Sequence, residues 1–225
     1  MDRHRELSAG VIPGHDLPEE TANSVTHGIG LALSIAAAAP LLAAAALYGG
    51  FWLLAGCGIY AATLIAVYAA STLSHAFCGT PLRRLFRILD QAFIFLLIAG
   101  TYTPFALGYL RDVWWWLLTG LVWGIALAGF FSKTVWRHRI DATTVWAYVV
   151  LGWLPTIALA RVVQILPFGV FWLMMIGGTC YMLGIVFLKL DRKFRYFHAT
   201  WHVAVVAGSA FHYAAILFYV VPLPA

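Results

Sequence analysis

Two histidine motifs and one aspartate are the residues of this sequence whose spacing could support metal chemistry. His198 and His202 stand four residues apart, and so do Ser71 and His75. Side chains four residues apart lie on the same face of a helix. The HxxxH spacing therefore places two imidazoles one turn apart, which suits a single metal ion. Among the nine acidic residues, Asp90 is the one that we expect to be buried.

Three neutral imidazoles with one open position form a ligand set that is typical of catalytic zinc. Water bound at the open position has a pKa near about 7 and is a nucleophile at neutral pH. A carboxylate beside that water, such as Asp90, can accept its proton. The hydroxyl of Ser71 can hold the same water, orient a ligand or stabilise an oxyanion. It can equally bond a carbonyl of its own helix.

The segments that carry these residues are apolar enough to lie in a membrane. Of 225 residues, 63% are hydrophobic and 10% are charged, whereas an average soluble domain has about 25% charged residues. Long apolar runs recur along the chain, which is typical of membrane-spanning helices. Seven segments are predicted to span the bilayer, at residues 22–48, 51–75, 86–109, 113–131, 142–161, 166–188 and 197–221.

The Lys and Arg residues predict the orientation of these segments. Twelve of the 14 precede the first segment or lie close after the ends of the second, fourth and sixth segments. The two exceptions are Arg111 and Arg161. The positive-inside rule then places the N-terminus in the cytoplasm and the C-terminus outside. We expect a polar cytoplasmic tail over residues 1–21 and a single all-α, seven-helix membrane domain over residues 22–225. The protein would be a multi-pass component of a bacterial-type inner or plasma membrane.

This topology brings four ionisable groups to the same membrane depth. His75 ends the second segment at its cytoplasmic side, and Asp90, His198 and His202 lie near the cytoplasmic starts of the third and seventh segments. Each group alone has an ordinary explanation, such as an interfacial histidine, or an Asp90 that pairs with Arg87 or caps its helix. Because ionisable groups inside a membrane usually mark functional sites, the four together favour a metal centre.

Two further histidines are interpreted as structural. His27 also lies near the cytoplasmic end, in the first segment, where an interfacial position is favoured over a supporting role at the metal. His212 follows His202 by ten residues, or about 15 Å along a helix, so it cannot bind the same ion. We expect His212 to form a hydrogen bond between helices in the core of the bundle.

The stretches NSVTHGIG, STLSH, LDQAFIFLLIAGTYTPF and HATWHVAVVAGSAFHY together resemble the hemolysin III family. That family groups with the progestin and adipoQ receptors and, more widely, with the alkaline ceramidases. The resemblance covers essentially residues 19–222 and implies a seven-helix bundle with zinc near its cytoplasmic side. By the same resemblance, zinc would be bound by His75, His198 and His202, with Asp90 holding the zinc water and Ser71 as the motif serine.

Three functions are compatible with these residues. The first is a zinc-dependent membrane hydrolase of a lipid-like amide or ester, with a membrane lipid as substrate and Asp90 as proton acceptor. The second is a receptor or sensor in which zinc ties the helices together. The third is a pore, although pores usually need polar residues along their whole path. No nucleic-acid partner is expected, because the basic residues lie in short loops, and the sequence leaves the oligomeric state open.

Overall fold

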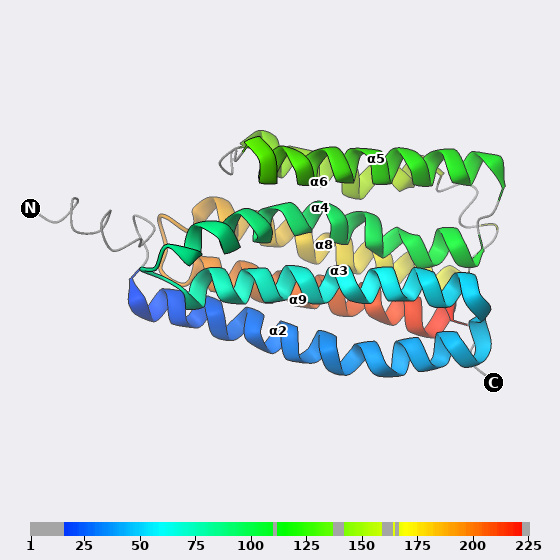
Figure 1. Ribbon diagram of the computed structural model, residues 1–225, viewed down its shortest axis with the longest axis horizontal. Coiled ribbons are helices and arrows are strands. Elements are labelled where there is room, and N and C mark those ends of the chain that lie inside the picture. The colour runs from blue at the N-terminus through cyan, green and yellow to red at the C-terminus, as the bar shows by residue number, and fades with distance from the viewer. Residues whose placement is uncertain (1–15, 110–111, 137–141, 159–163, 165–166, 222–225) are drawn as a thin grey trace, which may run out of the picture.

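The computed structural model describes residues 16–109, 112–136, 142–158, 164 and 167–221, and every regular element in these ranges is helical (Figure 1). The α-helices are α2 (Leu17–Ala44), α3 (Gly50–Ala76), α4 (Leu82–Gly108), α5 (Val113–Trp136), α6 (Ala142–Trp153), α8 (Phe168–Leu190) and α9 (Phe197–Ala215). Short π-helical turns, η1 (Ala45–Gly49) and η3 (Ile216–Val220), extend α2 and α9, and a 3-10 turn, η2 (Leu154–Ala158), extends α6. The predicted all-α class is confirmed.

Five helical stretches of the described residues are long and apolar enough to cross a membrane, which suits multi-pass insertion. They are Leu17–Ala76, Leu82–Gly108, Val113–Val135, Phe168–Leu190 and Phe197–Val220. The first stretch contains both α2 and α3, which lie side by side (Figure 1). The chain reverses between them at Gly50, whose φ of 70° is readily adopted only by glycine. Each of the seven predicted segments overlaps one helix; their number as membrane spans and their orientation stay predictions.

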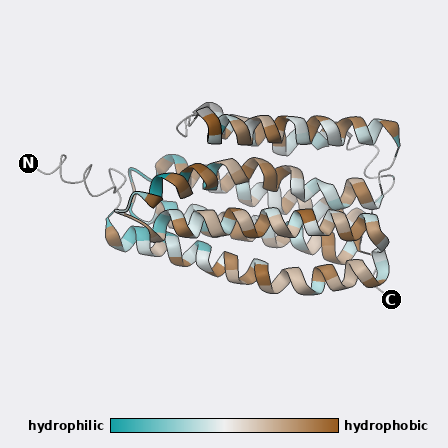
Figure 2. Cartoon of the chain, in the orientation of Figure 1, coloured by the Kyte–Doolittle hydropathy of each residue, from teal (hydrophilic) through white to brown (hydrophobic). Residues whose placement is uncertain are grey.

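The helices form a bundle with one hydrophilic end. The α3 helix packs against α2 and α4, α9 packs against α8 and α2, and α5 and α6 pack against α4. Hydrophilic residues gather where α2, α4 and α9 begin, whereas the remaining length is mostly apolar (Figure 2). Large apolar side chains such as Leu117 and Leu183 are exposed along that length. Such surfaces are expected to face lipid rather than water.

Two of the helix boundaries that differ from the prediction change where charged residues lie. The α2 helix begins at Leu17 rather than at residue 22, because Asp16 and Glu19 form a capping box: each side chain accepts a hydrogen bond from the other's backbone N–H. The α5 helix continues past residue 131 to Trp136, so Lys133 is buried in a helix rather than placed in a loop. Its Nζ donates a hydrogen bond to Thr144 Oγ1 at 2.6 Å. Arg111 and Arg161, the basic residues assigned to the outer side, lie outside the described residues.

Small residues let α8 and α9 approach closely in the middle of the bundle. A Cβ atom added at Gly177 would lie 2.4 Å from His212 Cδ2 and 2.9 Å from the carbonyl oxygen of Gly208. His212 Nε2 donates a hydrogen bond to the carbonyl oxygen of Met174 at 3.2 Å. The interhelical hydrogen bond predicted for His212 is therefore confirmed, and it depends on the close packing of small residues.

Substituting Gly177 should separate α8 from α9 and destabilise the protein. We expect Gly177→Ala to lower the free energy of unfolding by about 1–3 kcal/mol, because the new methyl group overpacks the contact. Gly178→Ala is the matched control, since a Cβ there meets nothing within 4 Å. Thermal unfolding in detergent measures both variants, and equal melting temperatures would contradict this account of the contact.

Candidate metal centre

Three histidines from two distant parts of the chain meet at the hydrophilic end of the bundle. His75 lies in the last turn of α3, and His198 and His202 lie in the first two turns of α9. One ligand atom from each comes within 4.8 Å of the others, so the group could hold a metal ion. His75 and His202 are buried and His198 is partly buried. The meeting of these three side chains agrees with the prediction that the topology brings His75 to the depth of His198 and His202.

Carboxylates orient two of the three rings. His75 Nδ1 lies 2.7 Å from Glu20 Oε2, and His198 Nδ1 lies 2.9 Å from Asp191 Oδ2. A carboxylate accepts these bonds, so each Nδ1 carries the proton and the lone pair is on each Nε2. Metal-binding histidines typically have such an acceptor behind them, which holds the ring in place and raises its basicity.

His202 is oriented by the backbone and has an unsatisfied nitrogen. Its Nδ1 lies 3.1 Å from the carbonyl oxygen of Asn23 and 3.2 Å from Thr26 Oγ1. Its Nε2 is buried and has no hydrogen-bond partner within the part of the chain that the structure describes. Leaving a buried acceptor unsatisfied costs about 1–3 kcal/mol. A metal ion at Nε2 would satisfy it, so the residues present fit a metal.

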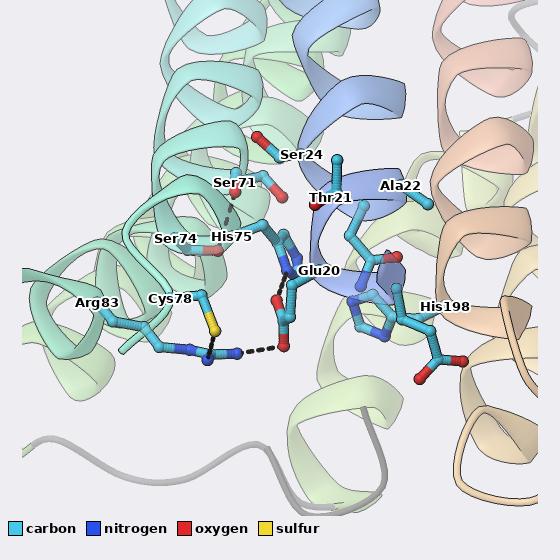
Figure 3. A network of polar contacts seen from close by, with 12 residues as sticks. Glu20, Thr21, Ala22, Ser24, Ser71, Ser74, His75, Cys78, Arg83 and His198 are labelled. Carbon is cyan, nitrogen blue, oxygen red and sulfur yellow. Dashed lines mark hydrogen bonds and ion pairs between the residues drawn. The ribbon is translucent and has the colours of Figure 1, made fainter. Parts of the chain in front are cut away.

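Glu20 connects the metal centre to two other helices. Its Oε1 accepts a hydrogen bond from Arg83 Nη2 at 2.5 Å, while its Oε2 faces His75 (Figure 3). Arg83 also donates from Nη1 to Cys78 Sγ at 2.9 Å. Burial raises the pKa of the Cys78 thiol although Arg83 opposes this, so the sulfur accepts the bond as a neutral thiol. One buried carboxylate thus ties the starts of α2 and α4 to the end of α3.

The start of α9, which carries His198, is held by the start of α2. Tyr196 precedes the helix with a φ of 63°, which is uncommon for a bulky residue. Its backbone N–H donates to Glu19 Oε1 at 2.8 Å, and the neighbouring Arg195 pairs with Asp16 at 2.5 Å. Because these contacts compensate for the strained turn, they fix the direction in which α9 leaves it.

Burial of acidic residues differs from the prediction. Glu20 is only 2% exposed and Glu19 only 5%, whereas Asp90, the one acid expected to be buried, is partly exposed. The prediction was wrong because it assigned residues 17–21 to a polar tail. A signal was present in the sequence, since Glu20, Asn23 and His27 recur at the spacing of one helix face.

His27 is part of the centre rather than an interfacial residue. It is 3% exposed, and its ring stacks on that of His202 with the centroids 3.6 Å apart. Its Nδ1 lies 2.6 Å from Ser71 Oγ. The interfacial interpretation of His27 was therefore wrong, because the close packing of α2 against α3 and α9 buries this part of α2.

Ser71 and Asp90 lie beside the three histidines. Ser71 is 1% exposed. Asp90 contacts the Ser71 hydroxyl and interacts with the charges of Arg87 and His198. Asp90 does not belong to the group of described residues that could hold the metal. All five predicted site residues are thus neighbours, with Asp90 and Ser71 outside the ligand group.

An apolar cavity of about 310 Å³ begins at this site. It touches His27 and Asp90 and continues between α4, α5, α6, α8 and α9. One face of α4 supplies much of its wall, through Asp90, Ile94, Leu97, Ile98, Thr101 and Phe105. Aliphatic and aromatic side chains dominate the remaining wall, so the cavity suits an apolar chain with its polar end near Asp90.

Removing the charge of Glu20 should weaken metal binding. We expect Glu20→Gln to lower metal affinity about tenfold or more, because the acceptor behind His75 becomes neutral. Glu19→Gln is the matched control, since Glu19 is also buried but accepts from two backbone N–H groups and not from a histidine, and the amide oxygen can keep one of these two bonds. Competition with a chromogenic chelator measures both affinities, and an unchanged value in Glu20→Gln would refute this role.

Comparison with known proteins shows similarity over nearly the whole chain. The family model described as "Haemolysin-III related" matches residues 15–213. A "Hemolysin-3 homolog" of Bacillus subtilis (strain 168) is 37% identical over 208 residues, which cover 92% of this chain and 97% of the relative. "Hemolysin-3" of Bacillus cereus is 37% identical over 204 residues, which cover 91% and 93%.

A human protein is a more distant relative. "Monocyte to macrophage differentiation factor" of Homo sapiens is 27% identical over 220 residues, which cover 92% of this chain and 86% of the relative. The bacterial matches exceed this identity, and the family model extends across α2 to α9. On these matches, the chain belongs to the haemolysin-III related family of membrane proteins.

Proposed function

We propose that this protein is a membrane-embedded, zinc-dependent hydrolase of a lipid-like amide or ester. The observation that carries the proposal is a three-histidine group whose neighbour Asp90 lines an apolar cavity. Three protein ligands leave one position of tetrahedral zinc open, as catalytic sites require. The cavity then offers a place for the apolar part of a lipid substrate.

The proposal includes seven membrane spans and a cytoplasmic N-terminus. Seven described helices overlap the seven predicted segments, and neighbouring helices pack against one another, which supports a single domain. The hydrophilic end of the bundle carries Arg83, Arg84 and the basic loop between α8 and α9. By the positive-inside rule this end faces the cytoplasm, so the metal centre would lie on the cytoplasmic side.

In the proposed mechanism, His75, His198 and His202 bind zinc through Nε2. When bound, zinc supplies a nucleophile at neutral pH by lowering the pKa of water to about 7. Asp90 accepts a proton on its carboxylate and returns it to the leaving amine or alcohol. Because a carboxylate only accepts, the Ser71 hydroxyl donates a hydrogen bond to Asp90 and accepts one from His27 Nδ1. His27 and Ser71 thereby hold the carboxylate in place.

The proton-acceptor role of Asp90 separates catalysis from metal binding. We expect Asp90→Asn to keep its zinc while hydrolysis falls about 10²–10⁴-fold, as loss of a general base does. His202→Ala should lose both zinc and hydrolysis, because it removes a ligand. Asp112→Asn is the control, since asparagine can still cap α5, where Asp112 Oδ1 accepts from Trp115 N–H.

The assay combines elemental analysis of the purified variants with release of fatty acid from an N-acylsphingosine, an N-acylethanolamine and a monoacylglycerol, measured by mass spectrometry. Wild-type protein without near-stoichiometric zinc would refute the metal assignment. Zinc-loaded, folded protein that releases no fatty acid from these probes would count against hydrolysis.

A receptor or sensor with structural zinc is the second candidate. It is favoured by the fact that the three histidines join α3 to α9, so a bound ion would tie these helices together. A pore is less well supported, because the cavity wall is mainly apolar.

Chelation distinguishes the hydrolase from the receptor. Removing zinc should both lower the melting temperature and abolish hydrolysis. For protein that was held at a free zinc concentration of 100 times the Kd, the free energy of unfolding should fall by about 2.7 kcal/mol. Differential scanning fluorimetry and the fatty-acid assay on the same sample measure both effects. A large loss of stability in a protein that shows no hydrolysis when loaded would favour the receptor.

A further inference from the structure

Arg87 extends the cavity face of α4 toward the hydrophilic end of the bundle. It precedes Asp90 by one helical turn, and the cavity wall continues from Asp90 through Ile94 along the same face. Arg87 is partly buried. Arg87 is not itself a lining residue of the cavity, but its position on this face places it one turn beyond Asp90, at the end of the cavity that is nearest the candidate metal centre.

The guanidinium of Arg87 has charged neighbours but no direct partner among the described residues. Its charge interacts with those of Asp90, Glu20 and Asp191. Among the described residues it forms no hydrogen bond or ion pair, because Glu20 is bound to His75 and Arg83, and Asp191 is bound to His198. A partly buried guanidinium with free donors is costly unless something accepts its hydrogen bonds.

The charges around the centre favour an anion as that acceptor. Glu20, Asp90 and Asp191 contribute three negative charges, and Arg83 and Arg87 contribute two positive ones. A divalent metal ion on the histidines would add two more positive charges near the guanidinium of Arg87. Because charge interactions are strong where water is largely excluded, an anionic group at Arg87 would be attracted by both the guanidinium and the ion.

We propose that Arg87 binds the anionic headgroup of a lipid whose apolar chain occupies the cavity. This inference rests on the proposed function in taking the cavity as the lipid site, and it adds that the lipid is anionic. The flat fork of arginine donors matches two oxygens of a phosphate or carboxylate. The same placement brings the bonds next to the headgroup close to Asp90.

Lipid retention by the zinc-loaded full chain tests this proposal. Protein in neutral detergent is exposed to equal amounts of phosphatidylglycerol and phosphatidylcholine with identical chains, and retained lipid is counted by native mass spectrometry. We expect wild type to retain more phosphatidylglycerol than phosphatidylcholine. In Arg87→Gln the ratio of the two retained lipids should fall about tenfold, because the hydrogen bonds from the guanidinium to the anionic headgroup are lost. Arg84→Gln, an exposed neighbour of equal charge, should keep it.

Further arms separate the possible outcomes. Arg87→Lys keeps the positive charge but not the planar pair of donors. Its preference for phosphatidylglycerol is therefore expected to lie between those of wild type and Arg87→Gln. A wild-type preference in both Arg87 variants, or an equal loss in Arg84→Gln, overturns the proposal. Inorganic phosphate that displaces the lipid at equal concentration would show a site for the free anion and also overturns it. Retention needs no turnover, so absent hydrolysis contradicts the proposed function without altering this result.

Discussion

The buried carboxylate of Glu20 is the interaction on which the arrangement of this protein depends. It lies between an imidazole and a guanidinium, His75 and Arg83, and thereby joins three helices. Removing one member of such a buried group typically costs about 3–5 kcal/mol, because the remaining charge loses its compensation. This one side chain orients the ring of His75. It also holds the first turn of α4 and the first turn of α2 against the end of α3.

The separation of polar and apolar regions makes the rest of the site possible. Hydrophilic residues gather at one end of the bundle (Figure 2), where the ion pairs of the described residues also lie, while the helices beyond it expose apolar side chains suited to lipid. The cavity reaches from Asp90 into that apolar region. A polar centre thus adjoins a space for an apolar chain, which is the arrangement that chemistry on a membrane lipid requires.

Helical spacing and the loop charges together predicted the three histidines of the candidate site. The motifs containing His75, His198 and His202 repeat at one turn, and the structure brings the three side chains together as the loop charges implied. Glu20 and His27 were not predicted as parts of the site. The average hydrophobicity of their segment placed Glu20 in a polar tail and His27 at the membrane interface. Average hydrophobicity describes a segment, whereas burial of one carboxylate depends on a partner such as Arg83 that is distant in sequence.

The sequence by itself determined the helical class, the membrane character and the faces on which the candidate ligands lie, since these depend on residues close together along the chain. Only the tertiary structure decided which acceptors stand behind the histidines and which groups surround Arg87. Those contacts join α2, α3, α4 and α9, and α2 meets α9 across nearly the whole length of the chain. Local periodicity cannot specify such pairs, because they arise from how complete helices pack against one another.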